Sequence, residues 1–211
     1  MRDGKPIVLV VDDDPALLAS VGRLLRSVGL DVQLFASIAD FLEFHPPNAP
    51  TCLVLDVRLP GQSGLDLQRE LTMMNRKVPI VFITGHGDIP MSVQAMKGGA
   101  IEFLTKPFRE QDLLDAIRLS FANDRAWREH ETELRVLRER FETLSPRERE
   151  IMIQVARGRL NKQIAFDIGI AESTVKVHRS NLMRKMKAGS PPELGLLADK
   201  LKLLAEKPQH P

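Results

Sequence analysis

Carboxylates stand where two short apolar runs end in the first half of the chain. Asp12, Asp13 and Asp14 follow the run Ile7–Val11, and Asp56 ends the run CLVLD. Adjacent like charges repel, and burying them is costly unless a cation lies among them. Such a cluster can hold Mg²⁺, which keeps several waters and takes its other ligands from one or two carboxylates and a phosphate.

Two more residues complete the chemistry of phosphoryl transfer. Thr84 ends a further apolar run, and Lys106 follows the last one. One carboxylate can act as a nucleophile and form an aspartyl phosphate, while a hydroxyl and an ammonium neutralise the phosphoryl oxygens. Taken singly, the acids are also compatible with a solvated loop that caps a helix at Pro15, and Lys106 with an ordinary loop. The four positions together favour the phosphoryl-transfer site.

A parallel sheet is the element that brings these positions together. Five β-rich runs alternate with stretches of helical periodicity, which predicts a parallel sheet covered on both faces; the runs are IVLVV (7–11), DVQLF (31–35), CLVLD (52–56), PIVFIT (79–84) and IEFLT (101–105). In the flavodoxin-like strand order 2-1-3-4-5, the first and third strands are neighbours, and ligands bind at the carboxyl ends of strands. The acids then share one crevice, with Thr84 and Lys106 on its other side.

The last part of the chain is basic and helical. Residues 1–120 hold 12 Lys and Arg against 15 Asp and Glu, whereas residues 143–188 hold 10 against 4. Ser145-Pro146-Arg147-Glu148 predicts a capped helix start, and Ser190-Pro191-Pro192-Glu193 predicts a second one. Asn161 opens a short helix, Gly169 ends it, and a longer helix follows over residues 172–187, which is a helix-turn-helix arrangement. A compact basic block behind an acidic one predicts a second domain that meets a polyanion.

The longer helix presents two faces. Its apolar residues, Val175, Leu182 and Met186 with His178, are expected in the core. The opposite face mixes cations, hydroxyls and a small apolar group, which suits base edges; it holds Ser173, Lys176, Val177, Ser180 and Arg184. Phosphate contacts are expected from the residues that flank this face, namely Arg179, Asn181, Lys185 and Lys162. A solvated basic helix in a bundle is the alternative.

A helical connector is predicted between the two blocks. No helix breaker occurs from Glu110 to Glu142, and Trp127, Leu134 and Phe141 lie seven apart. About two heptads are too few to argue for a coiled coil. The apolar stripe is therefore expected to pack on one of the domains, with a dimer seam as the alternative.

The totals agree with a cytoplasmic protein. The 211 residues include a single cysteine, Cys52, so no internal disulfide can form, and a buried inert thiol is expected there. No apolar stretch reaches the roughly 20 residues of a membrane helix, and the N-terminus lacks a cleavable signal.

Residues 5 to about 122 resemble the receiver domain of two-component response regulators, through VLVVDDD, LVLDVRLPGQSG, VFITGHGDIPMSVQAMKGGA and EFLTKPF. The resemblance implies that Asp56 accepts a phosphoryl group, and that Mg²⁺ is bound by Asp12, Asp13, Asp56 and the backbone carbonyl of Arg58. It further implies that Thr84 and Lys106 bind the phosphoryl oxygens, that Phe103 is the aromatic switch residue, and that Lys106-Pro107 is cis. His86 is interpreted as a loop residue beside the site.

The segment TLSPREREIMIQVARGRLNKQIAFDIGIAESTVKVHRSNLMRKMKAGSPPEL resembles the LuxR-type helix-turn-helix, and the whole chain resembles FixJ/NarL-type regulators. This implies a receiver at 1–122, a helical linker at 123–142 and a DNA-binding domain at 143–208. Lys176, Val177 and Ser180 would face the bases, although Ser180 is short for that role, and a terminal helix over 193–204 resembles the dimer-forming helix. The implied protein is a transcription regulator and not an enzyme; its partners would be a histidine kinase, promoter DNA, a second copy on phosphorylation and, for an activator, RNA polymerase.

Two rival functions remain open from the residues alone. A haloacid-dehalogenase-like phosphatase also uses a strand-end Asp, Mg²⁺, a Thr and a Lys, but its nucleophile follows the first strand, and it gives the basic block no role. A receiver-like interaction module without phosphorylation would not need the complete set of Asp, Thr and Lys.

Overall fold

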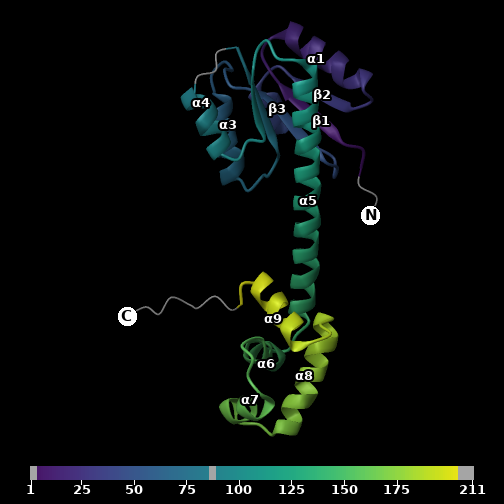
Figure 1. Cartoon of the computed structure of the whole chain (residues 1–211), viewed down its shortest axis with the longest axis vertical. Coiled ribbons are helices and arrows are strands. Elements are labelled where there is room, and N and C mark those ends of the chain that lie inside the picture. Colours follow the sequence, from purple (N-terminus) through teal and green to yellow (C-terminus); the bar gives the residue numbers. More distant parts are fainter. Residues whose placement is uncertain (1–3, 86–88, 204–211) are drawn as a thin grey trace. The chain divides into compact units, whose positions relative to one another are not determined.

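The computed structural model describes residues 4–85 and 89–203 and divides into two compact units, residues 1–128 and 129–211 (Figure 1). His86 lies outside the described residues, so its predicted loop position is not addressed. Within the described part of the chain, no helix is long and apolar enough to cross a membrane.

The first unit is built on the predicted five-stranded parallel sheet, in the order β2-β1-β3-β4-β5. The strands are β1 (Ile7–Val11), β2 (Asp31–Phe35), β3 (Thr51–Asp56), β4 (Ile80–Thr84) and β5 (Glu102–Thr105). They alternate with α1 (Pro15–Ser27), α2 (Ile38–Glu43), α3 (Gly64–Met73), α4 (Ile89–Lys97) and α5 (Glu110–Glu142). The sequence expectation of a doubly covered α/β sheet is therefore confirmed.

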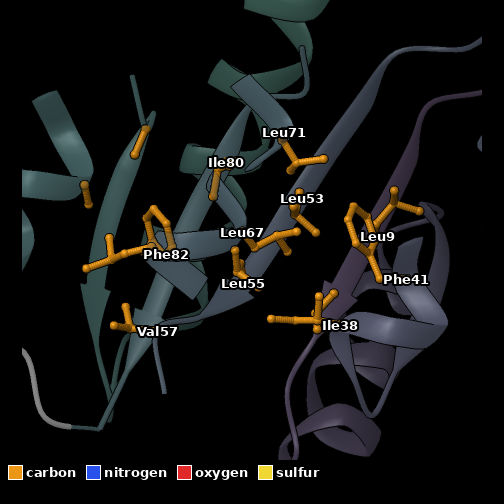
Figure 2. Packing of buried hydrophobic residues seen from close by; sticks show 14 of the residues in the cluster. Leu9, Ile38, Phe41, Leu53, Leu55, Val57, Leu67, Leu71, Ile80 and Phe82 are labelled. Atoms are coloured by element: carbon orange, nitrogen blue, oxygen red, sulfur yellow. The ribbon is translucent and has the colours of Figure 1, made fainter. Parts of the chain in front are cut away.

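Both faces of the sheet are covered because side chains alternate along each buried strand. Leu53 and Leu55 of β3 pack on one face with residues of α2, α3 and α4, as Figure 2 shows for Phe41 and Leu67. The next residues along β3 point to the other face, against α1 and α5. One of these is Cys52, whose burial raises its pKa to about 12, as expected for an inert thiol.

The second unit is all helical, with α6 (Pro146–Ala156), α7 (Asn161–Ile168), α8 (Glu172–Met186) and α9 (Pro191–Lys200). Ser145 and Glu148 form the predicted capping box of α6, and Gly169 ends α7 in the left-handed region at φ 68°. The terminal helix was expected over 193–204. It starts at Pro191 because the Ser190 side chain caps it, and it ends at Lys200, shortly before the left-handed Lys202.

Part of the apolar stripe of α5 packs inward. Trp127 lies beneath the ammonium of Lys77 in the first unit, with 5.1 Å between Nζ and the ring centroid. Leu137 is buried in the core of the second unit, and Phe141 packs against that core. Trp127 and Phe141 therefore pack on the domains as expected, whereas Leu134, the third member of the stripe, belongs to neither core.

Candidate functional site

Three carboxylates gather at the carboxyl end of the sheet. β1 pairs with β3 so that Val11 lies opposite Leu55, which places Asp12 next to Asp56. Asp12, Asp13 and Asp56 each offer an oxygen, and these oxygens lie within 4.8 Å of one another. Asp12 and Asp56 are buried, whereas Asp13 is exposed. Such an oxygen donor set fits a hard divalent cation such as Mg²⁺.

The third acid of the DDD run has another task. The Asp14 side chain caps α1 by accepting from the backbone N–H groups of Ala16 (2.8 Å) and Leu17 (3.4 Å). The backbone N–H of Asp14 donates to Asp12 Oδ1 at 2.9 Å, which helps to orient the Asp12 carboxylate. The helix-capping alternative is therefore correct for Asp14 and does not extend to the whole run.

Lys106 holds the two buried carboxylates together. Its Nζ lies 2.6 Å from Asp12 Oδ2 and 2.6 Å from Asp56 Oδ2. Burial alone lowers the pKa of Lys106, but the two carboxylates outweigh it, so the pKa is raised and the ammonium stays charged. Burial raises the pKa of Asp12, more than the hydrogen bonds from Lys106 and the Asp14 N–H lower it. A cationic side chain thus resides where three acids converge.

Thr84 and Phe103 stand on the neighbouring strands. Thr84 ends β4 as a buried residue, and its carbonyl accepts from the Lys106 N–H at 2.7 Å. Phe103 of β5 is half-buried, with its ring centroid 6.3 Å from that of Phe82. The Lys106-Pro107 bond is cis, as the resemblance implied.

A close approach of α3 to the site is one feature that the sequence reasoning missed. A Cβ at Gly64 would overlap the carbonyl oxygen of Asp56 and come within 3.1 Å of Leu55 Cγ. Only glycine lets α3 begin against the strand end that carries Asp56. The Arg58 N–H, from the intervening loop, donates to Asp56 Oδ1 at 2.9 Å. The second glycine of PGQSG, Gly64, was the signal in the sequence for this contact.

The predicted recognition face of α8 is open to solvent. Val175, Leu182 and Met186 are buried as expected, whereas His178 is only half-buried. Exposed residues line the opposite side of the helix, among them Ser173, Lys176, Val177, Ser180 and Arg184. Lys176 forms an ion pair with Glu172 at 3.2 Å, one turn back along the exposed surface.

The flanking polar residues fall into two groups. Lys162 is exposed at the start of α7, and Asn181 is half-buried, with its Oδ1 3.4 Å from a guanidinium nitrogen of Arg184. Arg179 and Lys185 instead make contacts between helices. Arg179 donates to Asn161 Oδ1 at 2.7 Å, which ties α8 to α7.

Lys185 lies 2.6 Å from a carboxylate oxygen of the buried Glu148 and 3.1 Å from the Thr143 carbonyl. Sequence reasoning did not foresee this contact, because the acid lies 37 positions away in the chain.

Comparison with known proteins gives matches over nearly the whole chain. Residues 8–118 match the response regulator receiver domain, and residues 142–198 match the luxR family of bacterial regulatory proteins. The chain is 51% identical to nodulation protein W of Bradyrhizobium diazoefficiens, over 95% of this chain and 88% of that protein. It is 46% identical to the response regulator TodT of Pseudomonas putida, over 96% and 89%.

Among solved structures, the response regulator StyR is 48% identical, covers 93% of this chain and 100% of its own, and superposes with a TM-score of 0.81. The acidic cluster with its lysine and the open basic helix thus lie in the two matched regions. The chain belongs to the two-component response regulators that join a receiver domain to a LuxR-type DNA-binding domain and act as transcriptional regulators.

Proposed function

We propose that Asp56 is the phosphoacceptor and that its phosphorylation by a sensor histidine kinase controls promoter binding. The observation that carries the proposal is the bridge from Lys106 to Asp12 and Asp56, 2.6 Å to each, beside the exposed Asp13. The boundaries that we propose are receiver 1–122, linker 123–142 and DNA-binding domain 143–208. A protein with these partners works in the cytoplasm.

In the proposed step, an Asp56 oxygen attacks the phosphorus of the kinase phosphohistidine. The P–N bond breaks, the imidazole leaves, and an acyl phosphate forms on Asp56. The Lys106 ammonium and the Thr84 hydroxyl neutralise the phosphoryl oxygens. Asp12, Asp13, Asp56 and the Arg58 carbonyl would hold Mg²⁺, which supplies further charge neutralisation when bound.

The expected consequence is dimerisation through α4. Ile89, Val93 and Met96 are exposed at 80%, 45% and 47% and recur at i, i+4 and i+7, so they share one face. Met91 and Ile101, on the same stretch of chain, pack against the core. A shift of Thr84 towards the phosphoryl group would give Phe103 room to move and would alter the surface of α4 and β5.

In the DNA-binding domain, we assign base contacts to Lys176, Val177 and Ser180. The phosphate contacts that we propose come from Lys162, Arg179, Asn181 and Arg184. Lys185 is left out of this set because its ammonium already binds Glu148 and the Thr143 carbonyl. Contact with RNA polymerase belongs to the proposal only if the protein activates transcription.

The test is phosphorylation with Mg²⁺ and a small acyl phosphate, followed by peptide mapping. One phosphoryl group is expected on Asp56 as a hydrolysis-labile acyl phosphate, and Asp56→Asn should abolish it. A phosphoryl group on Asp12 would instead favour the phosphatase alternative. Equal labelling of Asp56→Asn would remove the proposed role of Asp56.

A further inference from the structure

The last turn of α5 within the first unit carries a buried carboxylate. Asp124 is 2% exposed and accepts from the Thr51 N–H at 2.9 Å and from Arg128 Nε at 2.6 Å. A guanidinium nitrogen of Arg128 also donates to Asn48 Oδ1 at 2.8 Å. A buried carboxylate persists only where its partners are in place. We refer to Asn48, Thr51, Asp124 and Arg128 as the α5 clasp.

The α5 clasp and the proposed phosphoacceptor lie at opposite ends of one strand. Thr51 is the first residue of β3 and Asp56 is the last, and all six residues of β3 are buried. The clasp therefore attaches α5 to the same core strand that ends in Asp56.

Open hollows flank this turn of α5. Trp127 meets the loop of residues 75–78, where Lys77 lies over its ring. Hollows of about 340 and 250 Å³ are lined by this loop and by Trp127. Since close packing is what normally fixes a buried element, the polar contacts of the clasp must do more of the fixing here.

Beyond Arg128, the helix depends on its anchors. Residues 129–136 are exposed or half-buried, and the next buried residue, Leu137, belongs to the core of the second unit. These residues form the middle of a 33-residue helix, and because neither core includes them, their helical order depends on the packed turns on both sides. Loss of the first anchor should therefore let residues 124–136 fray.

We propose that the α5 clasp is the coupling element of the protein: it keeps residues 124–136 helical, so that phosphorylation of the receiver reaches the DNA-binding domain through a continuous helix. Without the clasp, the two domains respond independently. The inference rests on the proposed function, namely that phosphorylation at Asp56 controls DNA binding.

The experiment compares full-length Asp124→Ala with Asp115→Ala, a matched change on the same helix that removes exposed contacts with Arg118 and Gln111. Trp127, the sole tryptophan, reports on the clasp by fluorescence, and hydrogen exchange reports on residues 125–136. DNA affinity is measured with and without beryllofluoride, on a duplex that the wild-type protein selects from a random library. Phosphorylation of Asp56 is measured with a small acyl phosphate.

For Asp124→Ala we expect faster exchange over residues 125–136, altered Trp127 emission and unchanged phosphorylation. The gain in DNA affinity on adding beryllofluoride should fall at least about fivefold, the lower end of usual allosteric couplings. Asp115→Ala should match wild type in every measurement. If Asp124→Ala fails to fold, Arg128→Gln replaces it in the experiment. This variant removes the guanidinium but leaves the hydrogen bond from the Thr51 N–H to Asp124. The same fall in the beryllofluoride-induced gain in DNA affinity is expected.

Faster exchange over residues 125–136 with an unchanged gain in DNA affinity would overturn the coupling role. Unchanged exchange would overturn the fraying on which it depends. If the wild-type protein itself shows no gain with beryllofluoride, the proposed function fails instead, and the exchange and fluorescence results still decide whether the clasp holds α5.

Discussion

Replacing Glu148 with glutamine is expected to destabilise the second unit. Glu148 is 4% exposed and accepts from Lys185 Nζ at 2.6 Å and from the Ser145 N–H at 2.8 Å. Hydrogen bonds to charged groups contribute about 1.5–3 kcal/mol, against about 0.5–1.5 for neutral ones. Glutamine keeps a neutral acceptor, and Lys185 is partly exposed and retains the Thr143 carbonyl. The expected loss is therefore about 1–2 kcal/mol of unfolding free energy.

The Glu148 carboxylate should also make the stability of the second unit depend on pH. Burial tends to raise the pKa of Glu148, but the bonds from Lys185 and Ser145 outweigh it, so the pKa lies below its usual 4.5. The unfolded chain then binds the proton more readily than the folded one. The stabilisation is fully present above pH 4.5 and is lost as the pH falls through the folded-state pKa. The Glu148→Gln variant has no carboxylate to titrate at this position. The difference in unfolding free energy between this variant and the wild type should therefore shrink as the pH falls.

Thermal unfolding followed by circular dichroism, at neutral and acidic pH, measures the effect. Trp127 fluorescence identifies the transition of the first unit, which should not move. Glu150→Gln is the control, because Glu150 lies on the same helix in an exposed pair with Arg147, and such pairs contribute about 0–1 kcal/mol. If the two variants unfold alike at neutral pH, the pair of Glu148 and Lys185 contributes nothing and the reasoning is refuted.

Three further predictions concern the proposed sites. Asp13→Asn should weaken Mg²⁺ binding in calorimetry, because one ligand charge is lost, and an unchanged affinity would remove Asp13 from the metal site. Met96→Glu should prevent the mass increase that beryllofluoride causes in sedimentation while leaving phosphorylation intact; a dimer of normal stability would place the interface elsewhere than on α4. Lys176→Ala should cost about 1–3 kcal/mol on a selected duplex and flatten discrimination between sites, whereas Arg184→Ala should weaken selected and scrambled duplexes alike and lower the salt slope by about one ion. Equal losses for both variants on both duplexes would reduce α8 to an electrostatic anchor.

Local pattern was sufficient to predict the sheet and the place of the acids. β1, β3 and β4 are continuous buried runs, and each ends where a polar residue must meet solvent or a ligand. Parallel pairing then puts Asp12 and Asp56 side by side whatever the details of the loops. The helix ends were also predictable, since Ser145, Ser190 and Gly169 act within one turn of their own positions.

Contacts between distant residues were beyond the reach of local pattern. Asp14 could not be separated from Asp12 and Asp13 by residue type, because only the backbone turn decides which carboxylate points at α1. Asp124 carries no local signal of its role, because it accepts from a backbone N–H 73 positions earlier. For Asp124, this partner is fixed by how α5 packs on β3 and leaves no mark near the residue itself.

Lys185 shows why counting charges overstates a DNA-facing surface. Residues 143–188 contain ten cations and four acids, and each of the four acids pairs with a cation of the same segment, as Glu148 does with Lys185. Among the residues that the structure describes, six cations of this segment therefore have no carboxylate partner, namely Arg149, Arg157, Lys162, Arg179, Arg184 and Lys187. Arg149 stacks on Phe141, which leaves at most five of them, chiefly on α7 and α8, to contact phosphate. The net charge of the segment thus predicts the kind of partner correctly. Which residues contact the phosphates depends on which cations are already paired with carboxylates inside the domain.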